Sequence, residues 1–241
     1  MQFALLTDIH GNAQALQAVL QNIAERGIEK IYCTGDLIGI GHQTNEVLQL
    51  LSMLPHCEIV SGNHDEGVLA IARKQPYPKS HAAIREHHEW IAQQLDTAFI
   101  PFLQQLPRTL DRMLNSQRFL FTHYALKGAN IPFHHDPFAS IHEPSLENME
   151  KMFSGYPIYN CICFGHHHPQ HYFKNNKTIY INPGALGCSN KNKAKYAICT
   201  IDTSIHWDFI EVAYDYAQYI EDFKQTNIPD KEFILQAFYQ Q

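Results

Sequence analysis

The sequence has no long apolar run, no paired cysteine motif and little basic character. Its hydrophobic stretches are shorter than the roughly 20 residues of a membrane-spanning helix. Its first residues lack the basic and then apolar segments of a signal peptide. With 18 Lys and Arg against 24 Asp and Glu, the formal net charge of −6 argues against non-specific binding to nucleic acid or to an anionic membrane. We therefore expect a cytoplasmic protein without membrane contact.

The 6 cysteines form no CxxC pair, and most of them lie inside apolar runs. In a cytosolic protein such cysteines are usually buried small hydrophobic residues, so we expect structural roles for them. The 16 histidines are the unusual count in the composition. They make metal chemistry the first function to test.

The first part of the chain alternates short apolar runs with amphipathic segments. Apolar runs at 2–7, 28–34 and 59–60 predict buried strands, and apolar residues at helical spacing over 12–27 and 43–53 predict helices. This β-α-β-α-β order with short loops is typical of an α/β fold in which helices cover a parallel sheet.

The rest of the chain predicts a helical stretch, a hairpin, a long loop and further strands. The helical stretch covers 66–105 with breaks at Pro76 and Pro78, the hairpin covers 108–122, and the loop covers 125–144. Further strands are expected at about 158–164, 170–174, 178–182, 195–201 and 206–213, followed by a helix from 214. Since no repeat or linker interrupts the chain, we expect a single domain over 1–241.

Polar side chains follow the predicted strands at the points where these strands end. They are Asp8, His10, Asp36, Asn63, His64, Asp65, His123, His166, His167 and His168. Each alone has an ordinary structural interpretation, such as a helix cap or a turn. The carboxyl ends of parallel strands line the ligand crevice of α/β sheets, and Asp, Asn and His bind divalent ions. Five strand ends with such residues therefore favour a metal site.

The order of these residues resembles the calcineurin-like metallophosphoesterase superfamily. Its motifs are D-x-H, GD, GNH followed by an acidic residue, a single H, and GHxH. Here they read Asp8-Ile9-His10, Gly35-Asp36, Gly62-Asn63-His64-Asp65, His123 and Gly165-His166-His167-His168. Other segments, among them Asn182-Pro183-Gly184, resemble the bacterial branch of diadenosine-tetraphosphatase-like phosphodiesterases.

The resemblance implies a fold and a metal centre. The fold is a four-layer αββα sandwich of two mixed β-sheets flanked by helices, with a helical insert at about 66–105 and a loop insert at about 125–153 near the site. The cofactors are two divalent metal ions (Mn, Fe, Zn, Co or Ni, with Mn favoured) bridged by Asp36. The implied ligands are Asp8, His10 and His168 for one ion, and Asn63, His123 and His166 for the other. A near-extended backbone over 165–168 would place His166 and His168 on one side.

The resemblance also assigns catalytic roles. His64 is expected to act as general acid or to contact phosphate, with Asp65 orienting it, and substrate contacts are expected from Asn12, His42, Asn63 and His64. Two ions about 4 Å apart bind a bridging water, lower its pKa and neutralise phosphate oxygens. We therefore expect attack of a metal-bridging hydroxide on phosphorus in a small phosphorylated substrate, namely a phosphodiester or a nucleotide such as a dinucleoside polyphosphate.

Two other functions remain open at this point. A phosphomonoesterase or protein phosphatase would need an open groove, whereas 66–105 and 125–153 are expected to narrow the site. A non-catalytic scaffold of the same fold is less favoured because the chain keeps His64 and every metal ligand. His42 and Tyr124 depart from the bacterial branch, which leaves the substrate open. A monomer and a homo-oligomer are both compatible with the sequence.

Overall fold

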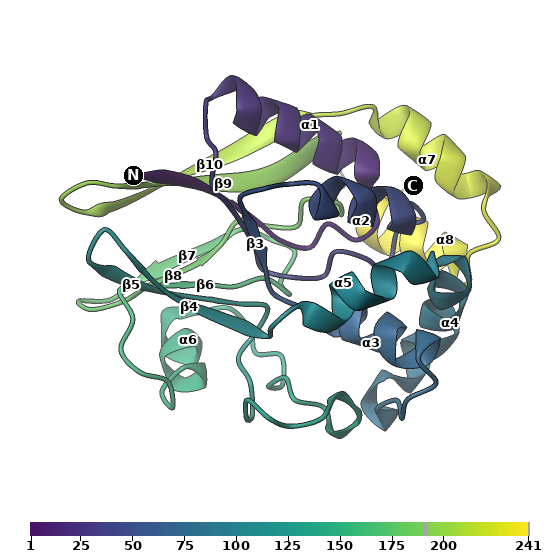
Figure 1. The fold of residues 1–241 in the computed structure, drawn as a ribbon, viewed down its shortest axis with the longest axis horizontal. Coiled ribbons are helices and arrows are strands. Elements are labelled where there is room, and N and C mark those ends of the chain that lie inside the picture. The colour runs from purple at the N-terminus through teal and green to yellow at the C-terminus, as the bar shows by residue number, and fades with distance from the viewer. Residues whose placement is uncertain (190–191, 241) are drawn as a thin grey trace.

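The computed structural model describes residues 1–189 and 192–240, in which two five-stranded sheets form the inner layers (Figure 1). In spatial order, the first sheet contains β10 (Ile205–Ala213), β9 (Lys193–Ile201), β1 (Gln2–Leu6), β2 (Ile31–Cys33) and β3 (Cys57–Ile59). The second contains β4 (Thr109–Leu114), β5 (Gln117–Thr122), β6 (Cys161–Cys163), β8 (Ile179–Asn182) and β7 (His171–Lys174). The expected α/β sandwich of two mixed sheets is confirmed.

Parallel strands form the part of each sheet that carries the expected site. β1, β2 and β3 pair in parallel, and β9 and β10 extend this sheet with antiparallel pairs. In the second sheet, β5, β6 and β8 pair in parallel between the antiparallel strands β4 and β7. The strands followed by expected site residues are β1, β2, β3, β5 and β6, so those residues leave the sheets at strand carboxyl ends.

Helices and short helical turns cover the outer faces of the sheets. The α-helices are α1 (Ala13–Glu25), α2 (Thr44–Ser52), α3 (Asn63–Ala72), α4 (Arg85–Gln94), α5 (Ile100–Gln105), α6 (Leu146–Met152), α7 (Tyr216–Gln225) and α8 (Lys231–Ile234). The shorter turns are η1 (Lys79–Ile84), η2 (Thr97–Phe99), η3 (Phe133–His135) and η4 (Leu235–Tyr239). The helical stretch expected at 66–105 is therefore α3 to α5. That the chain is a single domain over 1–241 stays a prediction.

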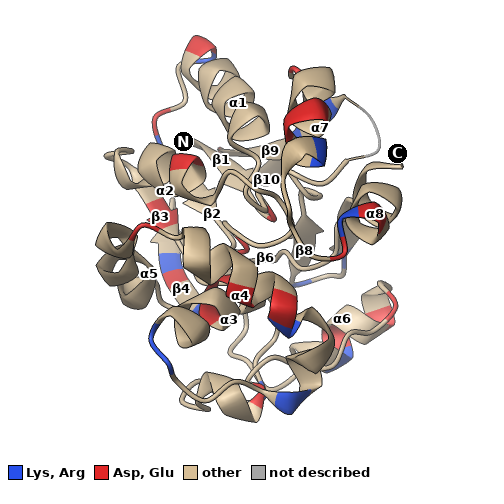
Figure 2. Cartoon of the chain, turned by 90° about the vertical axis from the view of Figure 1, so that its right-hand side faces the viewer, with Lys and Arg blue, Asp and Glu red and all other residues tan. Residues whose placement is uncertain are grey.

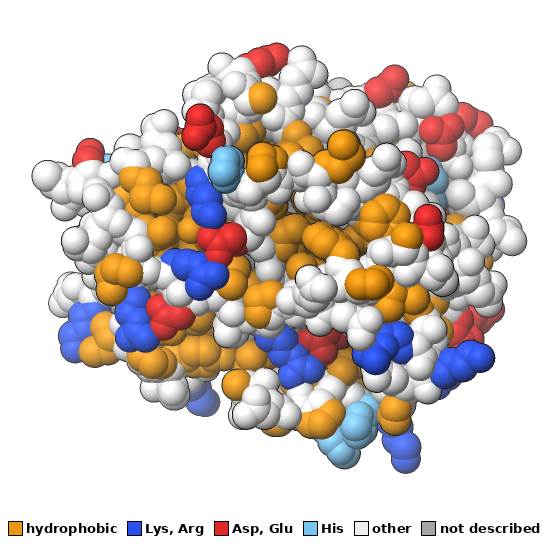
Figure 3. All heavy atoms as spheres, in the orientation of Figure 1, with side chains coloured by type: hydrophobic (Ala, Val, Ile, Leu, Met, Phe, Trp, Pro, Cys, Tyr) orange, Lys and Arg blue, Asp and Glu red, His pale blue; other side chains and the backbone are white. Residues whose placement is uncertain are grey.

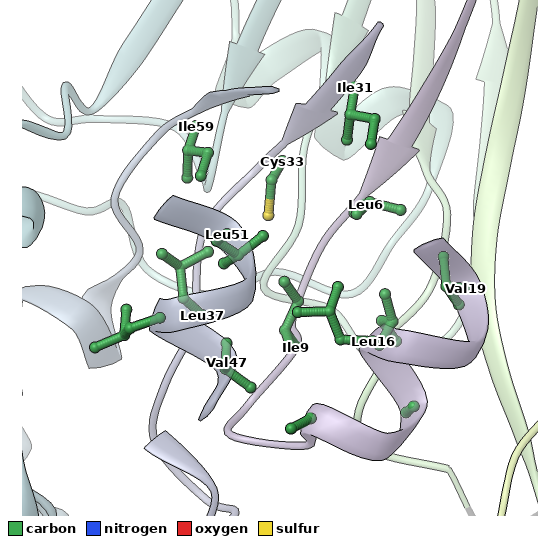
Figure 4. Close-up of a cluster of buried hydrophobic side chains, with 14 of the residues drawn as sticks. Leu6, Ile9, Leu16, Val19, Ile31, Cys33, Leu37, Val47, Leu51 and Ile59 are labelled. Atoms are coloured by element: carbon green, nitrogen blue, oxygen red, sulfur yellow. The ribbon is translucent and has the colours of Figure 1, made fainter. Parts of the chain in front are cut away.

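The helices pack on the first sheet through aliphatic side chains at helical spacing. Leu16 and Val19 of α1 and Val47 of α2 gather with Leu6 and Ile31 of the sheet (Figure 4). All five side chains are buried, and such burial contributes roughly 1.5–3 kcal/mol for each aliphatic side chain before entropy is subtracted. This packing fixes the carboxyl end of β1 beneath the start of α1.

The layer between the two sheets is rich in aromatic rings. Phe3 meets Phe121 edge to face with ring centroids 5.8 Å apart, and Tyr32 stacks on Phe121 at 3.9 Å. Cys161 and Cys163 both belong to this layer, as their spacing along one strand predicts. All 6 cysteines are free, but Cys188 lies within reach of His10 and His168 as a candidate metal-ligating group, so the structural roles expected for the cysteines stay a prediction.

Phe121 provides a test of the contact between the sheets. Replacing it with Ala removes a fully buried ring from between β2 and β5, so we expect Phe121→Ala to lower the free energy of unfolding by about 3–5 kcal/mol. Phe233→Ala is the matched control because Phe233 is 65% exposed. Chemical denaturation measures both variants. Equal losses in the two would contradict the packing described here.

Within the described part of the chain, no helix has both the length and the apolar character needed to cross a membrane. On the face shown in Figure 3, Lys and Arg side chains are interspersed with Asp and Glu.

Candidate metal centre

The loops that follow the strands carry the expected metal ligands in an uncommon backbone conformation. Asp8, His10, Asp36 and His166 have φ angles of 51°, 48°, 51° and 69°. Left-handed φ values are rare for residues other than glycine, and they cluster at functional sites because the surroundings must offset their strain. The backbone N–H groups of Asp8 and His10 donate to the carbonyls of Gly35 and Asp36, each at 3.0 Å, and so tie the first two loops together.

A first group of ligand atoms forms around His10. Its Nε2 lies 3.1 Å from Nε2 of His168 and 3.6 Å from Oδ1 of Asp8. The same nitrogen is 3.9 Å from Oδ2 of Asp36. Asp8, His10 and Asp36 are buried, and only His168 is partly exposed.

A second group forms around His123. Its Nε2 lies 3.1 Å from Oδ2 of Asp36 and 3.0 Å from Oδ1 of Asn63. Nδ1 of His166 is 3.2 Å from the same nitrogen and 2.9 Å from the Asn63 oxygen. Oδ2 of Asp36 therefore belongs to both groups. Figure 2 shows this end of the molecule, where α4, α7 and α8 surround the ends of β1, β2, β6 and β8.

The donor set fits divalent ions. Nδ1 of His123 donates its proton to the Thr34 carbonyl at 2.8 Å, so the neutral ring presents a lone pair at Nε2. That lone pair faces a carboxylate oxygen and an amide oxygen, an arrangement that requires a cation or a proton. Metal–ligand bonds of about 2.1 Å place neighbouring ligand atoms about 3.0–3.4 Å apart, close to most of the separations seen here.

The electrostatics of the two groups keep the carboxylates charged. Although burial disfavours ionisation, the charge of His123 and its hydrogen bond to the carboxylate hold the pKa of Asp36 well below its usual value. Burial lowers the pKa of His166 to about 3 and that of His168 to about 4. Both rings are therefore neutral at pH 7, which is the form that binds a metal.

His123 behaves differently from the other ligand histidines. Although burial opposes protonation, the Asp36 carboxylate raises the pKa of His123 to about 9. We therefore expect metal binding at pH 7 to release a proton and the apparent affinity to rise up to about pH 9. Because the folded pKa exceeds the unfolded value, the metal-free protein should lose stability as pH rises through 9.

Calorimetric titration in buffers of different ionisation enthalpy measures this proton release, and denaturation of the metal-free protein measures the stability change. An affinity that stays constant or falls between pH 7 and 9 would contradict the pairing of His123 with Asp36.

Gly62 leaves the space that the shared carboxylate occupies. A Cβ atom at this position would overlap Oδ1 of Asp36. Gly62→Ala is therefore expected to displace Asp36 and to lower metal affinity by roughly the 10- to 100-fold seen when a supporting group of a metal site is lost. Gly155→Ala is the matched control because nothing lies within 4 Å of its added Cβ. Competition with a chelator measures both affinities, and equal affinities would show that Asp36 does not depend on this space.

His64 lies beside the first group and is held by a residue that the sequence did not indicate. Its ring centroid is 5.1 Å from that of His10, in edge-to-face geometry. Nδ1 of His64 is 2.8 Å from Nε2 of His88, and Nδ1 of His88 is 2.8 Å from the Tyr77 hydroxyl. His88 is fully buried. Only the packing of α4 against α3 brings it to His64, and no local pattern reports that contact.

That Asp65 orients His64 stays a prediction, and the hydrogen bonds of its carboxylate go to backbone groups. Its carboxylate accepts hydrogen bonds from the backbone N–H groups of Leu37 at 2.9 Å, Ile38 at 3.2 Å and Gly62 at 2.8 Å. It therefore fixes the loop after β2 to the start of α3. His88, rather than Asp65, contacts the ring nitrogen of His64.

The substrate contacts expected from Asn12 and His42 stay predictions, and the structure shows which other groups these side chains contact. The Asn12 side chain accepts from Ala15 N–H at 2.9 Å as the N-cap of α1, and it donates to the Gly187 carbonyl at 3.0 Å. Its polar atoms are thus used within the chain. The His42 ring packs 5.1 Å from that of Tyr219 on α7. Both residues follow the expected motifs closely, but sequence proximity does not determine where a side chain points.

The three consecutive histidines are not extended. The left-handed conformation of His166 breaks the two-residue period, so His166 joins the second group and His168 joins the first. His167 is buried and packs 5.2 Å from the Tyr124 ring. The expectation that His167 lies apart from the other two agrees with this packing.

The class of protein follows from a family comparison. The profile of the calcineurin-like phosphoesterase superfamily domain matches residues 1–204. The chain belongs to this family.

The chain is also similar to individual proteins. An uncharacterized protein of Methanocaldococcus jannaschii is 29% identical over 248 residues, which cover 94% of this chain and 93% of that protein. A metallophosphoesterase from Sphaerobacter thermophilus has the same fold, with a TM-score of 0.75, 21% identity, and coverage of 99% and 98% of the two chains. A symmetrical bis(5'-nucleosyl)-tetraphosphatase of Baumannia cicadellinicola is 37% identical over 73 residues, or 30% of this chain and 25% of that protein.

Proposed function

We propose that the protein is a two-metal hydrolase of small phosphodiester or nucleotide substrates. The observation that carries this proposal is that Oδ2 of Asp36 belongs to two separate groups of ligand atoms, 3.9 Å from His10 Nε2 and 3.1 Å from His123 Nε2. A shared carboxylate is what two adjacent divalent ions require to offset their mutual repulsion.

The proposed ligand sets are the two groups described above. Asp8, His10 and His168 would hold one ion, Asn63, His123 and His166 would hold the other, and Asp36 would contribute to both sets. When bound, the two ions supply Lewis acidity and lower the pKa of the attacking water. Of these ligands only Asp8 and Asp36 are acidic, so the loaded centre keeps a net positive charge that suits an anionic phosphate.

The chain's own residues act on the leaving group. The water oxygen forms the new P–O bond, the P–O bond to the leaving oxygen breaks, and that oxygen takes the proton which the water releases. His64 is partly exposed beside the first group. We assign to it a hydrogen bond to the departing oxygen, which stabilises the charge that develops there.

The substrate class rests on the family and on one relative. A nucleotide such as a dinucleoside polyphosphate is supported by the short match to the bis(5'-nucleosyl)-tetraphosphatase. The preference for Mn²⁺ and the cytoplasmic location stay predictions.

Paired hydrolysis assays test this function. Bis-p-nitrophenyl phosphate and p-nitrophenyl phosphate are compared with added Mn²⁺, and dinucleoside polyphosphates are then compared with cyclic nucleotides and phosphopeptides. Faster cleavage of diesters and nucleotides than of phosphopeptides is the expected result. Preference for the monoester would shift the assignment to a phosphomonoesterase. If the metal-loaded protein hydrolysed none of these substrates, the proposal would be contradicted.

A further inference from the structure

Three side chains form a continuous hydrogen-bonded row that leads from the metal centre into the helical segment. Nδ1 of His64 is 2.8 Å from Nε2 of His88, and Nδ1 of His88 is 2.8 Å from the Tyr77 hydroxyl. His88 has no exposed surface. A buried imidazole of this kind is costly unless both of its nitrogens have partners, and here both do.

Two glycines leave the space that these imidazoles occupy. A Cβ at Gly39, where φ is +94°, would lie 2.7 Å from Nδ1 of His64. A Cβ at Gly67 on α3 would lie 2.5 Å from Nδ1 of His88. Because either methyl group would displace a ring, the backbone is matched to this row of side chains.

Tyr77 is itself held in place from two sides. The Arg85 guanidinium lies 5.4 Å from its ring centroid, and the Phe133 ring of η3 lies 6.1 Å away. The hydroxyl therefore has a fixed position next to His88. Its other neighbour, the His81 carbonyl, is 3.5 Å away, which is too long for a strong hydrogen bond.

The direction of these hydrogen bonds is assigned from their lengths, because a histidine ring nitrogen can either donate or accept. The Tyr77 hydroxyl has one proton and two acceptors within reach, and the proton is assigned to Nδ1 of His88 at 2.8 Å rather than to the His81 carbonyl at 3.5 Å. Burial lowers the pKa of His88 to about 3, so the ring is neutral and carries its one proton on Nε2. That proton is donated to Nδ1 of His64. Because Nδ1 of His64 accepts this hydrogen bond, a proton on the His64 ring is carried by Nε2, at the opposite end of the ring.

We infer that His88 and Tyr77 are positioning residues that hold His64 in the orientation and tautomer presenting Nε2–H to the departing oxygen of the substrate. The kinetic part of this inference rests on the proposed function, whereas the tautomer does not. The hydrogen bonds of His88 and Tyr77 given above go to no proposed metal ligand. The effect of replacing either residue on kcat can therefore be separated from an effect on metal binding.

Kinetics with two kinds of leaving group test the role. In His88→Leu we expect kcat to fall about 10- to 100-fold for a diester with a poorly acidic alcohol leaving group, as for loss of other supporting partners. Bis-p-nitrophenyl phosphate should be much less affected because its leaving group needs little stabilisation. His88→Gln keeps an N–H donor, so its kcat should fall less than that of His88→Leu. His87→Gln, the neighbouring buried histidine on α4, is the matched control and should match the wild type on both substrates.

A double-mutant comparison separates positioning from a general structural effect. In a His64→Ala background, His88→Leu should cause no further loss, because its target is absent. The inference would be overturned if His88→Leu lowered kcat equally for both leaving groups. It would also be overturned if His88→Leu lowered kcat as much in the His64→Ala background as in the wild type.

Nitrogen NMR of the Zn²⁺-loaded protein tests the tautomer without any turnover. His64 should be protonated at Nε2 in the wild type, with its signals assigned by comparison with His64→Ala. Tyr77→Phe and His88→Leu should shift this population toward Nδ1–H, while His87→Gln should not. An unchanged His64 tautomer in both variants would overturn the inference. If the wild type hydrolysed no diester, the proposed function would be contradicted. The NMR result would then decide the inference about His88 and Tyr77 by itself.

Discussion

Asp36→Asn is expected to abolish hydrolysis while the protein stays folded. The substitution keeps Oδ1, which accepts from the His64 backbone N–H at 2.9 Å, but it replaces the shared Oδ2 by an amide nitrogen that cannot bind a metal. Loss of a partner outside the ligand shell costs roughly 10- to 100-fold in metal affinity or activity, so loss of the bridge should exceed this range. Metal content should fall below two ions per chain at the same time.

The control for Asp36→Asn is the same change at an exposed carboxylate. Asp208 lies on β10 and is exposed, so Asp208→Asn should keep both activity and metal content. Circular dichroism and thermal unfolding verify that both variants fold. Wild-type turnover in a folded Asp36→Asn protein would remove Asp36 from the centre.

His64→Ala is expected to lower kcat about 10²- to 10³-fold for a substrate with a poor leaving group. Loss of one hydrogen-bond donor to a developing oxyanion has an effect of this size. The loss should be smaller for p-nitrophenolate, which is stable as an anion. Metal content should not change, because His64 contacts His88 rather than the shared carboxylate through its ring. The measurement is a comparison of kcat across diesters of increasing leaving-group pKa.

His206→Ala is the matched control, since His206 is exposed on β10. A His64→Ala protein that loses its metals would assign His64 a structural role instead. A loss that is the same for every leaving group would place His64 outside the bond-breaking step.

The candidate metal ligands were predictable because strand ends are encoded locally. Each apolar run stops where a polar residue begins, and parallel strands bring such ends to one edge of the structure. Asp8, Asp36 and His123 therefore lie together as expected. The order of the motifs also predicted the two mixed sheets.

Other parts of the site depend on tertiary contacts or on backbone geometry that local patterns do not contain. The row from His64 to Tyr77 forms only when α4 packs on α3, across a separation of 24 residues between the two histidines. The hydrogen bond from the Asn12 amide to the Gly187 carbonyl likewise joins residues 175 positions apart. The left-handed His166 overrode the two-residue period, because strained conformations arise where the fold, and not the local sequence, determines the backbone.

The central claim is that two ions bind side by side and share Asp36. Titration of the metal-free protein with Mn²⁺, followed by electron paramagnetic resonance, tests this most directly. We predict saturation at two ions per chain with a spectrum of two magnetically coupled Mn²⁺ ions, and loss of the coupling in Asp36→Asn. Saturation at one ion, or two ions whose spectra show no coupling, would contradict the account.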